Sequence, residues 1–133
     1  MLFTLDLDST VPLYQQIRDQ VVDGLATGAL RSGDSLPTVR QFAADFGVNL
    51  HTVRKAYELL EQEGFVRVRR QRGVTISPQP LRSVEPPVRW DARLRTLLAE
   101  EYAHGWTREE ILDQCRQVLA AFSEPSTEGR NHV

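Results

Sequence analysis

Apolar residues recur at helical spacing in three short segments of the first half of the chain. Pro12 is compatible with the start of the first helix, and Gly28 can end it. Thr38 and Gln41 form a capping-box pattern for the second helix, which Gly47 can end. The apolar stripes are Tyr14, Ile17, Val21 and Leu25, then Phe42, Ala43 and Phe46, then Val53, Ala56, Tyr57 and Leu60. Two short helices joined at a glycine predict a helix-turn-helix.

The third helix is followed by a pattern that is typical of a β-ribbon. Asn49 is a suitable N-cap for this helix, and Gly64 can end it. Apolar residues then alternate with arginines over 65–69, and a second alternating run covers 73–76, so we expect two strands. The predicted fold class is therefore mainly α with a small β-hairpin, arranged as a winged helix-turn-helix.

The second half of the chain begins with prolines and continues with two further helices. Four prolines over 78–89 indicate a linker. Gly105 separates two amphipathic patterns, and Thr107 with Glu110 forms a capping box for the second of them. We therefore divide the chain into four parts. These are a winged helix-turn-helix domain over 1–77, a Pro-rich linker over 78–89, a two-helix segment over 90–122 and a flexible tail over 123–133.

Length and composition are consistent with one small domain and a short appendage. The chain has 133 residues and a single cysteine, Cys115, which excludes an internal disulfide and fits a reducing compartment. The N-terminal apolar run is too short for a signal peptide, and no apolar stretch could span a bilayer. We expect a cytoplasmic protein without membrane contact.

The formal net charge of -2 hides an asymmetry along the chain. Through Ser83 there are ten Lys or Arg against nine Asp or Glu, which gives +1, and from Val84 there are six against nine, which gives -3. Screening confines the field of a charge to about 10 Å, so a local basic face is enough to engage phosphates. The overall charge therefore does not argue against nucleic acid as a partner.

The start of the predicted third helix carries side chains that can read DNA. His51 and Thr52 can donate or accept hydrogen bonds at base edges, and Leu50 can touch a thymine methyl group. The candidate contacts in this helix are Asn49, Leu50, His51, Thr52, Arg54 and Lys55. By themselves these residues also fit an ordinary solvated helix start in which two of them serve only as caps. Their place between a helix-ending glycine and a basic hairpin favours DNA contact.

Arg40 is a candidate contact near the start of the predicted second helix. A guanidinium there can clamp a phosphate or reach a guanine. The alternative is a surface arginine paired with an acid such as Asp45. We favour DNA contact.

The predicted hairpin contains four arginines and no acidic residue. Arg67 and Arg69 share a strand face because side chains alternate along a strand, and Arg70 and Arg72 lie at the tip. Such a wing could follow phosphates or enter the minor groove. An edge strand protected from aggregation by charge is the competing interpretation.

Three motifs together resemble the GntR family of bacterial transcription regulators. They are Pro12-Leu13-Tyr14-Gln15-Gln16-Ile17, the run Leu36-Pro37-Thr38-Val39-Arg40 after Gly33-Asp34, and Val48-Asn49 followed by Thr52-Val53 and Ala56-Tyr57. The two-helix tail is similar to that of the YtrA-type branch. The resemblance implies that Arg40, His51, Thr52 and Arg54 occupy DNA-contact positions. Wings of the family usually carry Gly-x-Gly, whereas this chain has Gln71-Arg72-Gly73, so Arg72 is the stronger candidate at the tip.

The two C-terminal helices carry more apolar side chains than they can cover for each other. The candidate dimerisation residues are Leu94, Leu97, Leu98, Tyr102, Ile111, Val118, Leu119 and Phe122. We expect a homodimer, and a two-fold axis would place two recognition helices about one DNA turn, or a multiple of it, apart. The competing interpretation is that the helix pair packs against the first helix.

Catalytic and metal chemistry have little support in the sequence. His51, His104 and His132 are scattered, no His/Cys pair has ligand spacing, and no nucleophile arrangement or glycine-rich phosphate loop appears. We expect no enzyme activity, no metal site and no cofactor.

The sequence thus predicts a homodimeric transcription regulator, a repressor that binds a palindromic operator in double-stranded DNA. One alternative is a winged-helix interaction module without DNA binding, since a fold does not fix a function. Another is a regulator whose C-terminal helices sense a small molecule. Neither the effector, if one exists, nor the operator sequence can be read from the residues.

Overall fold

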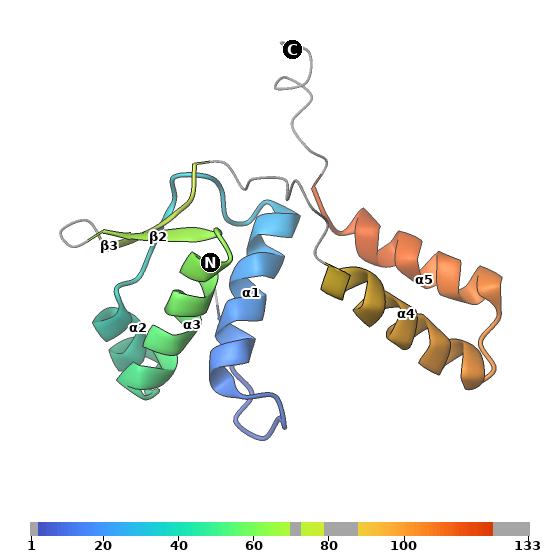
Figure 1. Cartoon of the computed structure of the whole chain (residues 1–133). Coiled ribbons are helices and arrows are strands. Elements are labelled where there is room, and N and C mark those ends of the chain that lie inside the picture. Colours follow the sequence, from blue (N-terminus) through green and yellow to red (C-terminus); the bar gives the residue numbers. More distant parts are fainter. Residues whose placement is uncertain (1–2, 70–72, 79–87, 124–133) are drawn as a thin grey trace, which may run out of the picture. The chain divides into compact units, whose positions relative to one another are not determined.

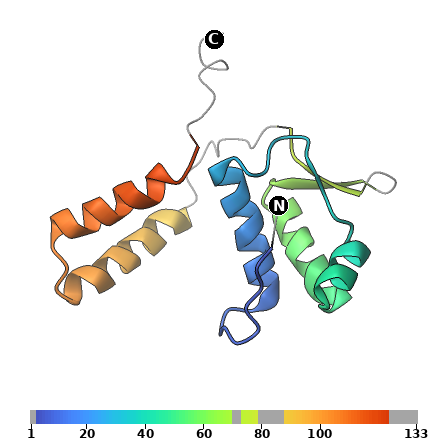
Figure 2. The same cartoon turned by 180° about the vertical axis from the view of Figure 1, so that it is seen from behind.

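The computed structural model describes residues 3–69, 73–78 and 88–123, in two compact units, Met1–Leu81 and Arg82–Val133 (Figures 1 and 2). The first unit contains α1 (Leu13–Thr27), β1 (Ser35–Leu36), α2 (Val39–Phe46), α3 (Leu50–Gln62), β2 (Val66–Arg69) and β3 (Gly73–Ile76). The second contains α4 (Val88–Ala103) and α5 (Arg108–Ala120). Within the described ranges, no helix has the length and apolar character needed to cross a membrane.

The predicted caps of α2 and α3 are confirmed. The Gln41 N–H donates to Thr38 Oγ1 at 3.1 Å and the Thr38 N–H donates to Gln41 Oε1 at 3.0 Å, which completes a capping box. Gly47 then ends α2 with a left-handed φ of 64°, a conformation that glycine adopts without a steric penalty. Two residues later the Asn49 side chain accepts the His51 N–H at 2.7 Å and opens α3. These caps fix the turn between the two helices.

The sheet has three strands rather than the two of the predicted hairpin. β2 and β3 pair antiparallel, with Val66 opposite Ile76 and Arg69 opposite Gly73. β1 adds to the other edge of β3, so the strand order is β1-β3-β2. Two residues are too few to show alternation, so β1 could not be predicted from the sequence. Phe65, predicted to start a strand, instead donates its N–H to the Leu60 carbonyl at the end of α3.

The core of the first unit forms where α1, α2, α3 and the sheet meet. It contains Ile17, Val21, Leu30, Leu36, Phe42, Val53, Ala56, Tyr57, Leu60, Val66, Val74 and Ile76. The predicted inner stripe of α3 is therefore confirmed in full. Tyr57 is only 1 % exposed, and its hydroxyl donates to the Pro37 carbonyl at 2.7 Å. Because this stripe of α3 is buried, the side chains on the other face of the helix point toward solvent.

Phe46 differs from the prediction, which placed it in the core. Its side chain is 38 % exposed because it lies in the last turn of α2, at the edge of the hydrophobic cluster. Its ring stacks on Phe42 with centroids 4.5 Å apart, and Phe3 packs against it edge-on at 5.9 Å. The N-terminal segment before α1 thus closes over the end of α2.

α4 begins at Val88, so its first two residues fall within the range 78–89 predicted as a linker. A proline restricts the residue before it rather than the one after it, so Val88 is free to begin a helix. At the other end, the Ser77 N–H donates to the Phe65 carbonyl at 3.0 Å, and the Ser32 hydroxyl donates to the Ser77 carbonyl at 3.1 Å and to the Pro78 carbonyl. Ser77 thus belongs to the winged unit.

The second unit is a hairpin of two helices that lie side by side (Figure 1). Gly105, with φ of 100°, follows α4. The predicted capping box of α5 is confirmed, since the Glu110 N–H donates to Thr107 Oγ1 at 3.1 Å and the Thr107 N–H donates to Glu110 Oε1 at 2.9 Å. None of the side chains of α5 is buried within this unit.

Candidate nucleic-acid interface

The first two turns of α3 present a polar surface opposite the buried stripe of that helix. His51, Arg54 and Lys55 are exposed, and so is the capping residue Asn49. Leu50 and Thr52 are half-buried and border this surface. The structure therefore places the N-cap and the five α3 residues predicted from the sequence together on and around one exposed helix start. This is the geometry that a recognition helix needs in order to reach base edges.

Arg40 and Arg54 form no ion pair with an acidic group in the described part of the chain. Both are exposed, and among the described residues the ion pairs are those of Arg18 with Asp19 and Glu63. The pairing of Arg40 with Asp45, considered as an alternative, is therefore absent. Both guanidinium groups keep their full hydrogen-bonding capacity for an external anion.

Lys55 has a partner that the sequence did not reveal. Its Nζ lies 4.0 Å from the centroid of the Tyr14 ring, within the range of a cation–π interaction. Tyr14 was assigned to the core stripe of α1, and it is half-buried against the core cluster. No spacing rule relates positions 41 residues apart, so this contact between α1 and α3 could not be predicted.

The described part of the wing carries two exposed arginines on its edge strand. Arg67 and Arg69 are exposed, whereas Val66 of the same strand is buried in the core. Gly73 begins β3 with a φ of 74°, and Thr38 Cγ2 lies 3.7 Å from where a Cβ would be. Arg70 and Arg72, both predicted as contacts, lie outside the described residues. The described strands thus direct a basic edge away from the core.

Glu61 connects the wing to the recognition helix. Its Oε2 accepts the Val68 N–H at 3.1 Å, a donor that faces away from β3 on the edge strand. An edge strand otherwise leaves such donors open to pairing with another chain. No sequence pattern predicted a role for Glu61. Its structural role is to tie β2 to α3.

Arg18 stabilises the fold, because carboxylates of the chain occupy its guanidinium group. Its Nε and Nη2 donate to Glu63 Oε1 and Oε2, both at 2.9 Å, and Nη1 donates to Asp19 at 2.9 Å. The hydrogen bond to Glu63 raises the pKa of the guanidinium above its ordinary value. The guanidinium carbon also lies 5.9 Å from the centroid of the Phe65 ring. Arg18 thus joins α1 to the end of α3.

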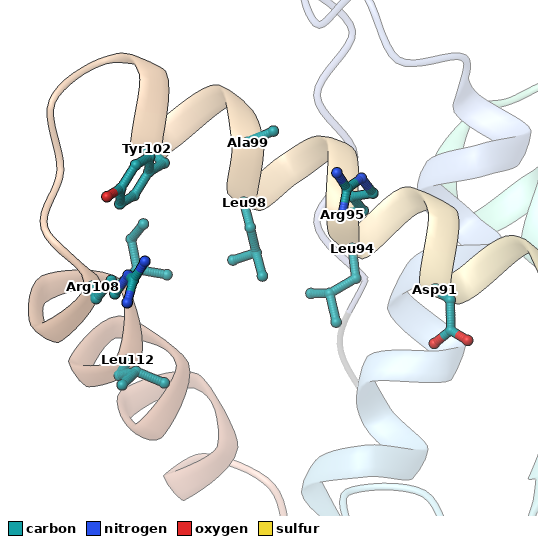
Figure 3. A pocket seen from close by; sticks show the side chains of 9 residues that line it. Asp91, Leu94, Arg95, Leu98, Ala99, Tyr102, Arg108 and Leu112 are labelled. Carbon is teal, nitrogen blue, oxygen red and sulfur yellow. The ribbon is translucent and has the colours of Figure 1, made fainter.

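Apolar side chains remain uncovered on two sides of the α4–α5 hairpin. One open groove of about 690 Å³ is lined by Trp90, Leu94, Leu97, Leu98, Glu101, Trp106, Ile111, Gln114, Cys115, Val118 and Leu119. A second of about 790 Å³ is lined by Asp91, Leu94, Arg95, Leu98, Ala99, Tyr102, Arg108, Ile111 and Leu112. Figure 3 shows Leu94, Leu98 and Tyr102 of this second groove directed toward α5.

The residues predicted for dimerisation are distributed unequally between these grooves. Six of the eight line the first groove, namely Leu94, Leu97, Leu98, Ile111, Val118 and Leu119. Tyr102 lines the second groove, and Phe122 is half-buried beyond the end of α5. Trp90 and Trp106, about half exposed, extend the first groove. The larger part of the predicted set therefore forms one continuous apolar surface.

No group of three or more His, Cys, Asp or Glu in the described ranges is arranged to hold a metal ion.

Comparison with known proteins identifies the family. The family described as bacterial regulatory proteins, gntR family, matches residues 13–76, which extend from α1 to the end of β3. The structure of YtrA from Sulfolobus acidocaldarius, a GntR-family transcription factor, is 34% identical, with 88% of this chain and 96% of that chain covered and a TM-score of 0.53. The chain belongs to the GntR family. The resemblance inferred from the three motifs is confirmed, as is the winged helix-turn-helix followed by two helices.

Two further relatives each match about half of the chain. The HTH-type transcriptional regulator Rv1152 of Mycobacterium tuberculosis is 44% identical over 73 residues, which are 55% of this chain and 60% of the relative. The HTH-type transcriptional repressor YtrA of Bacillus subtilis is 41% identical over 73 residues, 55% of this chain and 56% of the relative. The chain therefore spans less than two thirds of the length of either. The family is one of transcription regulators, which agrees with the expectation of a protein that is not an enzyme.

Proposed function

We propose that this chain is a cytoplasmic, homodimeric transcription repressor that binds a palindromic operator. Residues 1–77 would bind DNA, 78–89 would link, 90–122 would dimerise and 123–133 would form a tail. The observation that carries the proposal is the exposed start of α3, where hydrogen-bonding side chains lie beside arginines that no acid of the described chain occupies. Free cationic donors next to base-reading groups suit a DNA groove and its flanking phosphates.

The DNA-contacting set of the proposal combines α2, α3 and the wing. It comprises Arg40, Asn49, Leu50, His51, Thr52, Arg54, Lys55, Arg70, Arg72 and Gly73. Arg54 is the strongest base-contact candidate because it is exposed in the second turn of α3 and has a guanidinium that can bind guanine in bidentate fashion. The wing arginines would engage the backbone and add sequence-independent affinity.

Homodimerisation is proposed through the groove that contains the two tryptophans. Leu97, Val118 and Leu119 are each about half exposed or more within their unit. Exposed apolar surface of this extent on a short helical hairpin marks an interaction site. A second copy related by a two-fold axis would offer the same surface and cover both. A repressor role is favoured by the similarity to the B. subtilis relative, which is a transcriptional repressor.

The alternatives differ in what they leave unexplained. An interaction module without DNA binding would use exposed apolar anchors at its contact face, whereas the exposed start of α3 is polar and basic. A small-molecule sensor in the α4–α5 groove would need polar groups to orient its ligand, and that groove offers Glu101 and Gln114 among mostly apolar side chains. DNA binding accounts for the charged surface directly.

The test uses a duplex selected from a randomised pool by the full chain. Mobility shifts should give an affinity that falls steeply with salt, because binding releases counterions from the phosphates. Arg54→Ala should weaken binding by about 1–3 kcal/mol. Arg116→Ala, which removes an exposed arginine of α5, is the matched control and should bind like the parent. Failure to select any duplex would refute the proposal, and equal binding by both variants would refute the role of Arg54.

A further inference from the structure

Lys55 is the only lysine of the chain, and the structure gives it an unusual neighbour. The other 15 of the 16 basic residues are arginines. Glu58, three residues later on α3, would be the ordinary ion-pair partner for a helical lysine. Within the described residues Lys55 nevertheless forms no ion pair, and its Nζ lies 4.0 Å from the centroid of the Tyr14 ring. The contact therefore needs an explanation beyond charge pairing on one helix.

The ring is the fixed member of this pair. Tyr14 is half-buried and packs against the hydrophobic core, whereas Lys55 is exposed. A free lysine side chain has four flexible bonds, and ordering it on binding costs conformational entropy. Because the ring already holds the ammonium in place, the lysine side chain loses less conformational entropy when an anion binds to it.

The position of Lys55 relates this contact to the proposed DNA interface. Lys55 follows His51 by one helical turn, so both side chains share the outward face of α3. Tyr14 meets Lys55 and Arg18 meets Glu63, so α1 and α3 run in the same direction along their contact, as Figure 1 shows. The pair thus lies on the α1 side of the proposed recognition surface.

We propose that Tyr14 is a positioning residue of the DNA interface, whose ring holds the Lys55 ammonium where it binds a phosphate beside the groove. One side of the ammonium faces the ring, and its remaining N–H donors are available to phosphate oxygens. The inference rests on the proposed function. It adds a residue on α1, outside the helix-turn-helix, to the groups that determine affinity.

The contact itself can be tested without DNA. Because Lys55 is the only lysine, the full chain labelled with ¹³C-lysine should give a single CεH₂ correlation in NMR spectra. The Tyr14 ring current should shift this signal upfield, and Tyr14→Phe should preserve the shift. Tyr14→Leu should return the signal to the position of a free lysine. An identical signal in the parent and in Tyr14→Leu would overturn the proposal.

The role in binding is tested by a double-mutant cycle on the duplex selected by the full chain. Lys55→Ala should weaken binding roughly 10-fold and lower the salt slope by about 1, as expected for one lost phosphate contact. Tyr14→Leu should weaken binding about 5-fold when Lys55 is present and less than about 1.5-fold in Lys55→Ala. Tyr14→Phe should restore binding to within about twofold of the parent, because phenylalanine retains the ring.

Tyr14→Leu weakening binding equally with and without Lys55 would overturn the inference, because the effect would then be structural. The same conclusion follows if Tyr14→Leu has no effect on binding while its thermal unfolding matches the parent. If the parent selects no duplex, the proposed function itself fails. If the parent binds with a steep salt dependence but the cycle shows no coupling, only the positioning role is lost.

Discussion

The basic residues of the winged unit differ in what surrounds their charged groups. Arg18 is enclosed by two carboxylates and faces an aromatic ring, so it stabilises the contact between α1 and α3. Arg40 and Arg54 carry the same charge without such partners among the described residues. Lys55 is intermediate, since an aromatic ring holds it without neutralising it. Surroundings rather than residue type therefore separate the structural cations from those available to DNA.

Tyr57 provides a prediction about stability. Burial raises the pKa of its hydroxyl above the ordinary value. Above about pH 10 the unfolded chain releases this proton while the folded chain keeps it, so the Tyr57 contribution is present below that pH and is lost as the pH rises. Tyr57→Phe lacks this dependence and should cost about 1 kcal/mol near neutral pH for the lost hydrogen bond to Pro37.

Urea unfolding of the parent and of Tyr57→Phe at about pH 9 and about pH 11 measures this effect. The free energy of unfolding of the parent, relative to that of Tyr57→Phe, should fall by about 1.4 kcal/mol between the two conditions, so that the variant becomes the more stable protein at the higher pH. A constant difference would mean that the hydroxyl does not remain protonated in the folded state.

At the scale of elements, the wing depends on the conformation of one glycine. Gly73 has a φ of 74°, which L-residues adopt at a cost. A Cβ would lie 3.7 Å from Thr38 Cγ2, an ordinary contact, so the penalty of a substitution is conformational rather than steric. Gly73→Ala should therefore lower the free energy of unfolding by about 1 kcal/mol.

Gly73→Asn is the comparison that isolates this cause. Asparagine has a larger side chain but tolerates the left-handed region better than alanine. In urea unfolding, the free energy of unfolding should be highest for the parent, lower for Gly73→Asn and lowest for Gly73→Ala. A larger loss for asparagine than for alanine would indicate a steric cause instead.

Local signals predicted most elements, and contacts between distant segments were not predictable. The capping boxes at Thr38 and Thr107 depend on residues three apart, and the stripe of α3 depends on helical periodicity, so both could be read directly. β1 is too short for any periodicity. The Tyr14–Lys55 and Glu61–Val68 contacts depend on how α1, α3 and β2 pack. Sequence patterns therefore identified the elements of the site but missed the contacts that orient them.

For the whole molecule, the account requires a second copy on the α4–α5 hairpin. Leu119, 63 % exposed, lies in the groove proposed as the dimer surface, and Leu112, 52 % exposed, lies in the other groove on the same helix. Leu119→Glu should convert the dimer to a monomer, because it would place two charges in an apolar contact. Leu112→Glu makes the same chemical change at similar exposure and should leave the dimer intact.

Sedimentation equilibrium of the two variants decides between the grooves. The monomeric Leu119→Glu variant should also bind the selected duplex at least 10-fold more weakly than the parent. In the dimer, binding of one winged domain to its half-site holds the second domain near the other half-site, and a monomer lacks this effect. A dimer that survives Leu119→Glu and dissociates with Leu112→Glu would assign the interface to the opposite groove.

The central claim is that the outward face of α3 enters a DNA groove, once in each subunit. Glu58 lies on this face, is exposed and is not among the proposed contacts. In a Cys115→Ser background, Glu58→Cys carrying an iron chelate would cleave nearby DNA. We predict cleavage of the selected duplex at two symmetry-related positions, about one helical turn or a multiple of it apart. Cleavage no stronger than that from the same chelate on Gln117→Cys in α5 would contradict the account.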